Sequence, residues 1–167
     1  MNMKIGILSD SHDNLPALEW VVSVFNAENV DLVIHCGDVV APFTYRILAQ
    51  LNAKITAVFG NNDGELLGLK ETFAKLGEIS KPPKEIEIDG KKILIDHFFT
   101  EHHIEALAAS GEYFAILFGH THQVVNKQIG NTLVVNPGET CGYLTARCTC
   151  ALLDTETGTA EIRELES

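Results

Sequence analysis

The chain has 167 residues, of which 46% are hydrophobic and 21% charged, a composition typical of a globular protein with one domain, residues 1–167. Its formal net charge of -11 argues against a broad nucleic-acid-binding surface, which needs a basic face. No apolar run approaches the roughly 20 residues that span a membrane, and no secretory signal precedes the first predicted strand. We therefore expect a cytoplasmic protein, with its cysteines as free thiols (Cys36, Cys141, Cys148 and Cys150).

The first half of the chain predicts three strand–helix units in succession. Apolar runs at residues 4–8, 31–35 and 54–59 indicate short buried strands. A helix capped by Asn14 is expected after the first strand, and helices at residues 42–51 and 65–76 after the other two. The side chains expected to face inward from these helices are Leu18, Val21, Val22, Phe25, Phe43, Ile47, Leu48, Leu51, Leu66, Leu69, Phe73 and Leu76.

The second half predicts mainly strands. Residues 85–88 and 92–95 form a hairpin around Asp89-Gly90, and a helix at 101–110 precedes a buried strand at 115–118. Two further hairpins are expected, from 124–128 with 132–135 and from 147–154 with 159–164. The first part favours a parallel sheet covered by helices, and the last part favours a second, mainly antiparallel sheet. The pattern therefore predicts an α/β fold with two sheets packed face to face and helices outside.

Residues that can bind a metal follow five of the predicted strands. They are Asp10 and His12, Asp38, Asn61, His97, and the pair His120 and His122. Sites in open α/β sheets form beyond the carboxyl ends of the strands, so all these residues can meet there. We expect His120 and His122 to converge on one point, because side chains at i and i+2 of an extended segment share a face. Gly119 would let the backbone turn before them.

Seven nitrogen and oxygen donors are too many for one tetrahedral metal site, and they suit two cations that share a carboxylate. Imidazoles beside carboxylates favour manganese, iron, zinc, nickel or cobalt over magnesium alone. Each motif taken singly has an ordinary interpretation: the histidine pair could be hydrogen-bonded in a loop, and Asp10 could be a turn residue. The occurrence of all of them at strand ends is what favours a two-metal site.

The motifs also carry a family resemblance. Asp10-x-His12, Gly37-Asp38, Gly60-Asn61-Asn62-Asp63, His97 and Gly119-His120-x-His122 resemble the motif series of the calcineurin-like metallophosphoesterases, in particular their small single-domain phosphodiesterase branch. The resemblance implies a four-layer αββα sandwich of two mixed β-sheets flanked by helices. It also implies two divalent transition-metal ions, with Mn²⁺ or Ni²⁺ favoured and Fe, Zn or Co as further candidates.

By the matching positions, the resemblance implies two sets of ligands with Asp38 as the bridge. One set is Asp10, His12, Asp38 and His122, and the other is Asp38, Asn61, His97 and His120. The implied activity is hydrolysis of a small phosphoester, most of all a phosphodiester, by in-line attack of a hydroxide that bridges the two metals. Asn62, Asp38 and His97 are the implied catalytic residues.

Two positions depart from the family pattern. Asn62 stands where many members have a histidine that protonates the leaving group, and an amide has no proton to give. His97-Phe98-Phe99 stands where relatives often have His-Gly-His. Phe98 and Phe99 could be core residues, or one could line the pocket and stack on an aromatic or base group of the substrate.

Other functions remain open at this point. The strongest alternative is a catalytically weak or inactive metal-binding module of the same fold that serves protein interactions. A nucleotide-binding function is less strongly indicated, because the chain lacks both the GxGxxG motif and the GxxxxGK[ST] motif. Cyclic nucleotides, other phosphodiesters and small phosphomonoesters are all candidate substrates. The chain is not expected to bind membranes, and a homo-oligomer is one possible state of assembly.

Overall fold

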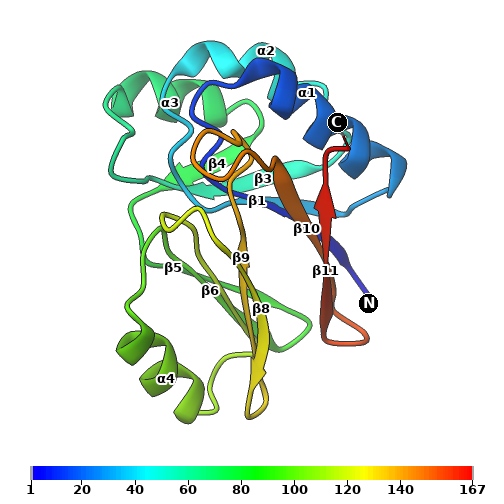
Figure 1. Ribbon diagram of the computed structural model, residues 1–167, viewed down its shortest axis with the longest axis vertical. Coiled ribbons are helices and arrows are strands. Elements are labelled where there is room, and N and C mark those ends of the chain that lie inside the picture. Colours follow the sequence, from blue (N-terminus) through cyan, green and yellow to red (C-terminus); the bar gives the residue numbers. More distant parts are fainter. Residues whose placement is uncertain (1, 167) are drawn as a thin grey trace.

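The computed structural model describes residues 2–166 and consists of two β-sheets packed face to face with helices outside both (Figure 1). The first sheet contains β1 (Lys4–Leu8), β2 (Leu32–His35), β3 (Lys54–Val58), β4 (Gly77–Ser80), β10 (Thr149–Asp154) and β11 (Thr159–Glu164). The second contains β5 (Lys84–Ile88), β6 (Lys91–Ile95), β7 (Ala115–Leu117), β8 (Val124–Ile129) and β9 (Thr132–Pro137).

Helices cover the two outer faces. Above the first sheet in Figure 1 lie α1 (Leu15–Ala27), a short 3-10 turn (Pro42–Thr44) that continues as α2 (Tyr45–Leu48), and α3 (Leu66–Phe73). Below the second sheet lies α4 (Glu101–Ala109), which confirms the predicted αββα sandwich. Asn14 caps α1 as predicted, since its side-chain oxygen accepts a hydrogen bond from the backbone N–H of Ala17 (3.3 Å).

Three apolar clusters separate the four layers. Residues such as Ile7 and Ile34 of the first sheet pack against Ile95 and Val135 of the second, and this cluster joins the two sheets. The other two clusters bury the helices against the sheets, with Phe25 of α1 inside one of them. Because successive side chains of a strand point to opposite faces, strands covered on both sides carry near-continuous apolar runs, as β1 does at residues 5–8 and β10 at residues 150–153.

The strand order places the ligand-type residues at one edge of the molecule. β1, β2, β3 and β4 run parallel, in the order β11-β10-β1-β2-β3-β4. In the second sheet, β6, β7 and β9 also run parallel to one another, in the order β5-β6-β7-β9-β8. The carboxyl ends of β1, β2, β3, β6 and β7 therefore lie at neighbouring edges of the two sheets.

The predicted distribution of strands between the sheets was partly wrong. The last hairpin, β10 with β11, does not belong to the second sheet but extends the first one, with β10 antiparallel to β1. The second sheet is mixed rather than mainly antiparallel. The reason lies in β10: its residues Cys150 to Leu153 are buried on both faces, which requires a central position such as the one beside β1.

Two helix predictions also need correction. The expected helix at 42–51 is only a 3-10 turn and one turn of α-helix, and Phe43 is 53% exposed instead of facing inward. Helix α3 ends at Phe73, and Leu66 at its first position is 40% exposed. A 3-10 segment has three residues per turn, so Phe43 is out of phase with the buried Ile47. Strand β4 was not predicted, because a four-residue edge strand with one buried side chain carries too little periodicity.

Among the described residues, no helix is long and apolar enough to cross a membrane. All four cysteines are free, as predicted, and all but Cys148 are buried, where they pack as small apolar side chains.

Candidate metal centre

The loops that follow five strands meet at one edge of the sandwich and bring together all seven predicted ligands. Their side chains form two groups. The first contains Asp10, His12 and His122, and the second contains Asn61, His97 and His120. Asp38 lies between the two groups: its Oδ2 atom is 3.4 Å from His12 Nε2 and 3.4 Å from His97 Nε2.

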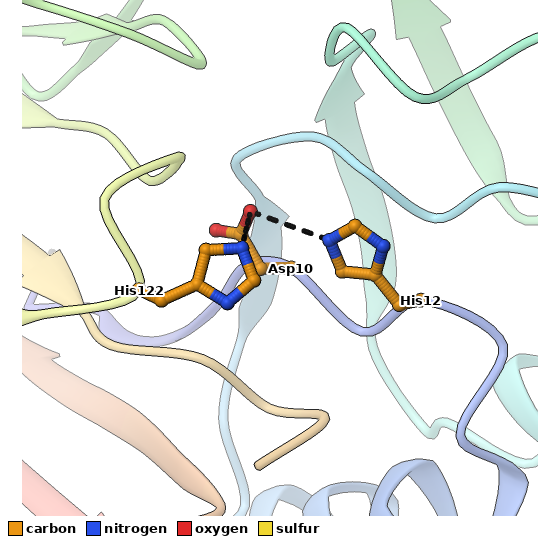
Figure 2. A group of neighbouring side chains, drawn as sticks. All are labelled: Asp10, His12 and His122. Atoms are coloured by element: carbon orange, nitrogen blue, oxygen red, sulfur yellow. Dashed lines mark ion pairs between the residues drawn. The ribbon is translucent and has the colours of Figure 1, made fainter. Parts of the chain in front are cut away.

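The first group has three donor atoms that point toward one another (Figure 2). Asp10 Oδ1 lies 3.3 Å from His122 Nε2 and 3.7 Å from His12 Nε2. Asp10 Oδ1 and His12 Nε2 are buried and have no hydrogen-bond partner within the described part of the chain. Ligand atoms that each lie about 2.1 Å from a shared cation are about 3.0 to 3.4 Å apart. The 3.3 Å spacing lies in this range and the 3.7 Å spacing is slightly wider, so a small movement of His12 would bring all three atoms to a shared cation.

The other oxygen of Asp10 is held by the protein. Ser9 Oγ donates a hydrogen bond to Asp10 Oδ2 (2.6 Å), and the backbone N–H of His120 donates to the same atom (2.9 Å). Gly119 is needed here because its Cβ position would come within 1.9 Å of Ser9 Oγ. Gly119 was expected to let the backbone turn, but it is not among the glycines with positive φ, so the close approach of Ser9 is the observed reason for a glycine here.

The second group is built around Asn61. Its Oδ1 atom lies 2.9 Å from His97 Nε2 and 2.8 Å from His120 Nδ1. Nδ1 of His97 lies 2.7 Å from the backbone carbonyl of Cys36, which can only accept, so Nδ1 donates and a neutral ring presents a lone pair at Nε2. That lone pair faces the oxygens of Asn61 and Asp38. Acceptor atoms that point toward one another are stabilised when a cation binds between them.

The electrostatics of the site also fit divalent cations. Burial raises the pKa of Asp38, but contacts with His12, His97 and Asn62 outweigh it and hold the pKa well below its usual range. Burial likewise raises the pKa of Asp10, and contacts with His12 and Ser9 again bring it below its ordinary value. The two carboxylates raise the pKa of His12 to about 9. Both carboxylates are thus ionised at neutral pH, and their field attracts positive charge.

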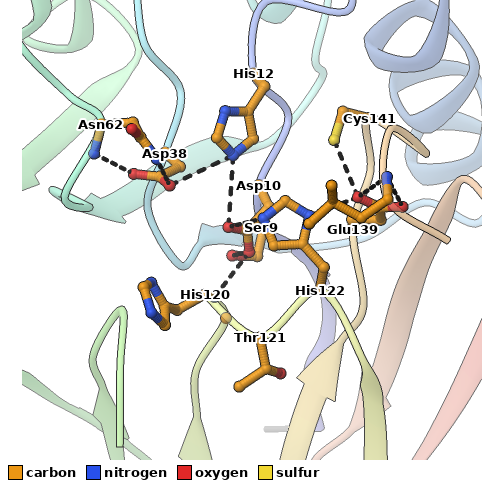
Figure 3. A network of polar contacts seen from close by, with 12 residues as sticks. Ser9, Asp10, His12, Asp38, Asn62, His120, Thr121, His122, Glu139 and Cys141 are labelled. Atoms are coloured by element: carbon orange, nitrogen blue, oxygen red, sulfur yellow. Dashed lines mark hydrogen bonds and ion pairs between the residues drawn. The ribbon is translucent and has the colours of Figure 1, made fainter.

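The backbone around the ligands is strained. Positive φ angles occur at seven residues other than glycine in these loops: Asp10, His12, Asp13, Asp38, Val40, His120 and His122. Such conformations cost about 1 kcal/mol or more each and cluster at functional sites. They also correct the expected geometry of His120 and His122. These residues are not extended, and their rings point to different groups instead of converging on one point (Figure 3).

Asn62 lies against the shared carboxylate. Its backbone N–H donates to Asp38 Oδ1 (2.8 Å) and its side-chain amide donates to Asp38 Oδ2 (2.8 Å) (Figure 3). The neighbouring Asp63 is buried and accepts hydrogen bonds from the backbone N–H groups of Asp38, Val40 and Gly60. These contacts fix the loops after β2 and β3 relative to each other.

The prediction from sequence missed Glu139, which follows β9 and is fully buried. Its Oε2 atom lies 2.5 Å from His122 Nδ1, so that the imidazole donates to the carboxylate and turns Nε2 toward Asp10 (Figure 3). Burial raises the pKa of Glu139, but the contacts with His122 and Thr145 outweigh it and lower the pKa to about 2. An acidic residue directly after Asn136-Pro137-Gly138, at the end of another parallel strand, was the available signal.

Glu139 supports a ligand and does not itself complete a third metal site. Its carboxylate lies close to both His122 and Cys141, and the three side chains could form a metal-binding set by distance alone. Burial raises the pKa of the Cys141 thiol to about 12, so the sulfur stays protonated at neutral pH and is a poor ligand. Glu139 also accepts hydrogen bonds from Thr145 and from the backbone of Leu144.

Comparison with known proteins agrees with this geometry. The family described as "Calcineurin-like phosphoesterase superfamily domain" matches residues 3–158. The chain belongs to this family. A phosphodiesterase of Methanocaldococcus jannaschii is 46% identical over 156 residues, which cover 92% of this chain and 94% of that protein. Phosphodiesterase YfcE of Escherichia coli strain K12 is 29% identical, over 81% of this chain and 78% of the relative.

A solved structure of an archaeal phosphodiesterase superposes with a TM-score of 0.91 at 43% identity, over 98% of this chain and all of that one. This calcineurin-like phosphoesterase is therefore a hydrolase of phosphoester bonds that works with divalent metal ions. The predicted family, fold and general reaction are confirmed. The roles of the individual site residues remain predictions.

Proposed function

We propose that this protein is a phosphodiesterase that holds two divalent transition-metal ions. Asp10, His12, Asp38 and His122 would bind the first, and Asp38, Asn61, His97 and His120 the second. The observation that carries the proposal is the position of Asp38, whose Oδ2 atom lies at 3.4 Å from a histidine nitrogen of each group. A carboxylate between two sets of donors is the ligand that a two-metal centre shares.

The types of donor atom in the two groups indicate which metals would bind. Imidazole nitrogens outnumber carboxylates in both groups taken together, and this mixture of imidazole and carboxylate suits Mn²⁺, Ni²⁺, Fe, Zn or Co better than Mg²⁺ alone. Among these we favour Mn²⁺ or Ni²⁺. When bound, two such cations supply a hydroxide at neutral pH for in-line attack on phosphorus and neutralise charge on the phosphoryl oxygens.

The chain's own residues position this chemistry. Glu139 and the carbonyl of Cys36 orient His122 and His97, so that each ring turns Nε2 into the site. Asn62 holds Asp38 through its amide and backbone N–H, and it can also donate to a phosphoryl oxygen of the substrate. Since Asn62 cannot donate a proton to a leaving alkoxide, we expect diesters with good leaving groups to react fastest.

The test is hydrolysis by the chelated and the reconstituted protein. Chelator should abolish turnover of a diaryl phosphodiester, and Mn²⁺ or Ni²⁺ should restore it more fully than Mg²⁺. Metal analysis should give two ions per chain. His120→Ala should lower both activity and metal content, whereas His102→Ala should change neither, because the His102 side chain is 97% exposed on α4. Full activity of chelated protein, or hydrolysis of monoesters alone, would contradict the proposal.

A further inference from the structure

A cavity of about 460 Å³ opens beside the second group of ligands. Asn61, His97 and His120 form one wall, and Phe59, Leu66, Pro82 and Phe98 form much of the rest. Cavities of this size hold a small organic group. Because three predicted ligands line it, whatever fills this cavity is joined to the reacting phosphorus or lies directly against it.

Two large apolar side chains of the cavity are exposed. Phe98 is 47% exposed and Leu66 is 40% exposed, although both are large and apolar. The ring of Phe98 lies 4.7 Å from the ring of His120, at an interplanar angle of 60°. Phe98 is therefore fixed against a predicted ligand and presents the rest of its surface to the cavity. Phe99, the other candidate from the sequence, is buried against Phe118 and belongs to the core.

The cavity has little net charge. Lys81 and Asp96 reach it with opposite charges, and Asp96 already accepts hydrogen bonds from the backbone N–H groups of His97 and Phe98. Asp63, which also lines it, is fully engaged with backbone N–H groups. Both carboxylates at the cavity thus already accept hydrogen bonds, which leaves Lys81 as the one charged side chain of the lining without a partner among the described residues. A flat ring would pack on Phe98 and Leu66.

We infer that this cavity is a subsite for an aromatic ester group of the substrate, with Phe98 as its specificity-determining residue. The inference rests on the proposed phosphodiesterase function and adds the class of substrate: phosphodiesters with an aryl group or a nucleobase on one side. An aromatic pair contributes about 0.5–1.5 kcal/mol beyond its buried area, which corresponds to a preference of about tenfold at most from stacking alone.

The experiment separates ring binding from leaving-group reactivity. The Mn²⁺-loaded protein is given methyl phenyl phosphate and a methyl fluoroalkyl phosphate whose alcohol has the same pKa as phenol. A second pair consists of the methyl phosphate diester of a nucleoside and its abasic analogue. We expect kcat/KM to favour the aromatic member of at least one pair by about tenfold, mainly through KM. The pair that shows the preference identifies an aryl group or a nucleobase as the occupant.

The variants assign the preference to the cavity wall. Phe98→Ala should remove most of it and Phe98→Tyr should keep it. Leu66→Ala should reduce it. Phe43→Ala and Leu165→Ala are the matched controls, because both residues are exposed and apolar and neither lines this cavity. If Phe98→Ala merely loosened His120, both members of a pair would slow equally and the ratio would stay unchanged.

Equal kcat/KM within both pairs, or a preference that survives Phe98→Ala, would overturn the inference. No turnover of any of the four esters would contradict the proposed function instead. Binding then decides the inference separately: calorimetry should show phenylphosphonate binding more tightly than methylphosphonate to the wild type but not to Phe98→Ala. Equal affinity of the two phosphonates for the wild type would overturn it without any use of turnover.

Discussion

The two groups of ligands share Asp38 but differ in how the protein surrounds them. Asp10 is fully buried, and Ser9 and Glu139 hold it and His122 in place. In the second group His97 is buried, but Asn61 and His120 are exposed and face the apolar cavity. A ligand whose partners fix its orientation binds metal more firmly than one that is free to move. If the proposed two-metal centre is correct, we expect the first group to hold its ion more firmly and the second to present its ion to the substrate.

The largest effect is expected where the two groups meet. Asp38→Asn removes the shared charge, so both ions should be weakened and kcat/KM should fall about a thousandfold, as expected for several kcal/mol of lost charge stabilisation. Metal analysis and kinetics measure this, with Asp31→Asn as a control at an exposed carboxylate. Two tightly bound ions and normal turnover in Asp38→Asn would show that the groups are independent.

His35 supports the loop that carries the first group, and its contribution to stability can be tested by varying the pH. His35 is fully buried, and its Nε2 atom lies 2.9 Å from the hydroxyl of Ser11, between Asp10 and His12 in sequence. Burial lowers the pKa of His35 to about 4, below the ordinary 6.5. Since the folded protein favours the neutral ring, its contribution is complete above pH 6.5 and is lost as the pH falls toward 4. The loss amounts to about 3 kcal/mol of unfolding free energy.

Denaturant unfolding in chelator at pH 7 and pH 4.5 measures this loss. Other groups also titrate in this range, so the difference between wild type and His35→Gln isolates the histidine. The variant should show a flatter decline in stability. If the unfolding free energy fell equally with pH in the two proteins, protonation of His35 would not destabilise the fold, and His35 would not fix the loop after β1.

Glu139 contacts His122 of the first group, so its substitution should weaken metal binding by that group selectively. Glu139→Gln weakens the hydrogen bond that orients His122, and changes of this kind cost about 10- to 100-fold in metal affinity. Only the tighter of two binding steps should weaken in a calorimetric titration. Glu164→Gln, which breaks the exposed ion pair with Arg147, serves as the control and should alter neither step. Equal weakening of both steps would contradict the division into a firmly held and an exposed ion.

The smallest expected effect concerns the exposed side of the site. Asn62→His places a group that can give up a proton beside Asp38, where the wild type has an amide. We expect diesters with poor leaving groups to react about tenfold faster, less than the full benefit of a positioned acid. The dependence of kcat/KM on leaving-group pKa, measured for both proteins, should be steep in the wild type and shallower in Asn62→His. Equal slopes would show that another group supplies the proton.

The structure brings the seven predicted residues together, but not in the geometry expected for His120 and His122. Strand ends could be recognised from apolar runs, and the family motifs separate His122 from His120 as the two side chains are separated in the structure. The assumption of an extended segment failed, because hydrogen bonds between the loops hold both histidines at positive φ. Glu139 was missed because no short motif links it to His122. The cavity depends on Leu66 and Pro82, which periodicity alone cannot bring next to Phe98.

The position of β1 also has a consequence for biosynthesis. β1 leaves the ribosome long before β10, yet β10 is one of its two neighbours, with Lys4 opposite Asp154. At ribosomal rates of synthesis β1 waits roughly 10 s for this partner, with one edge unpaired and apolar side chains on both faces. During that time the nascent chain offers other strands a place to pair, which makes it a substrate for chaperones. Glu139 is synthesised just ahead of β10, so its contact with His122 also has to wait for this late part of the chain.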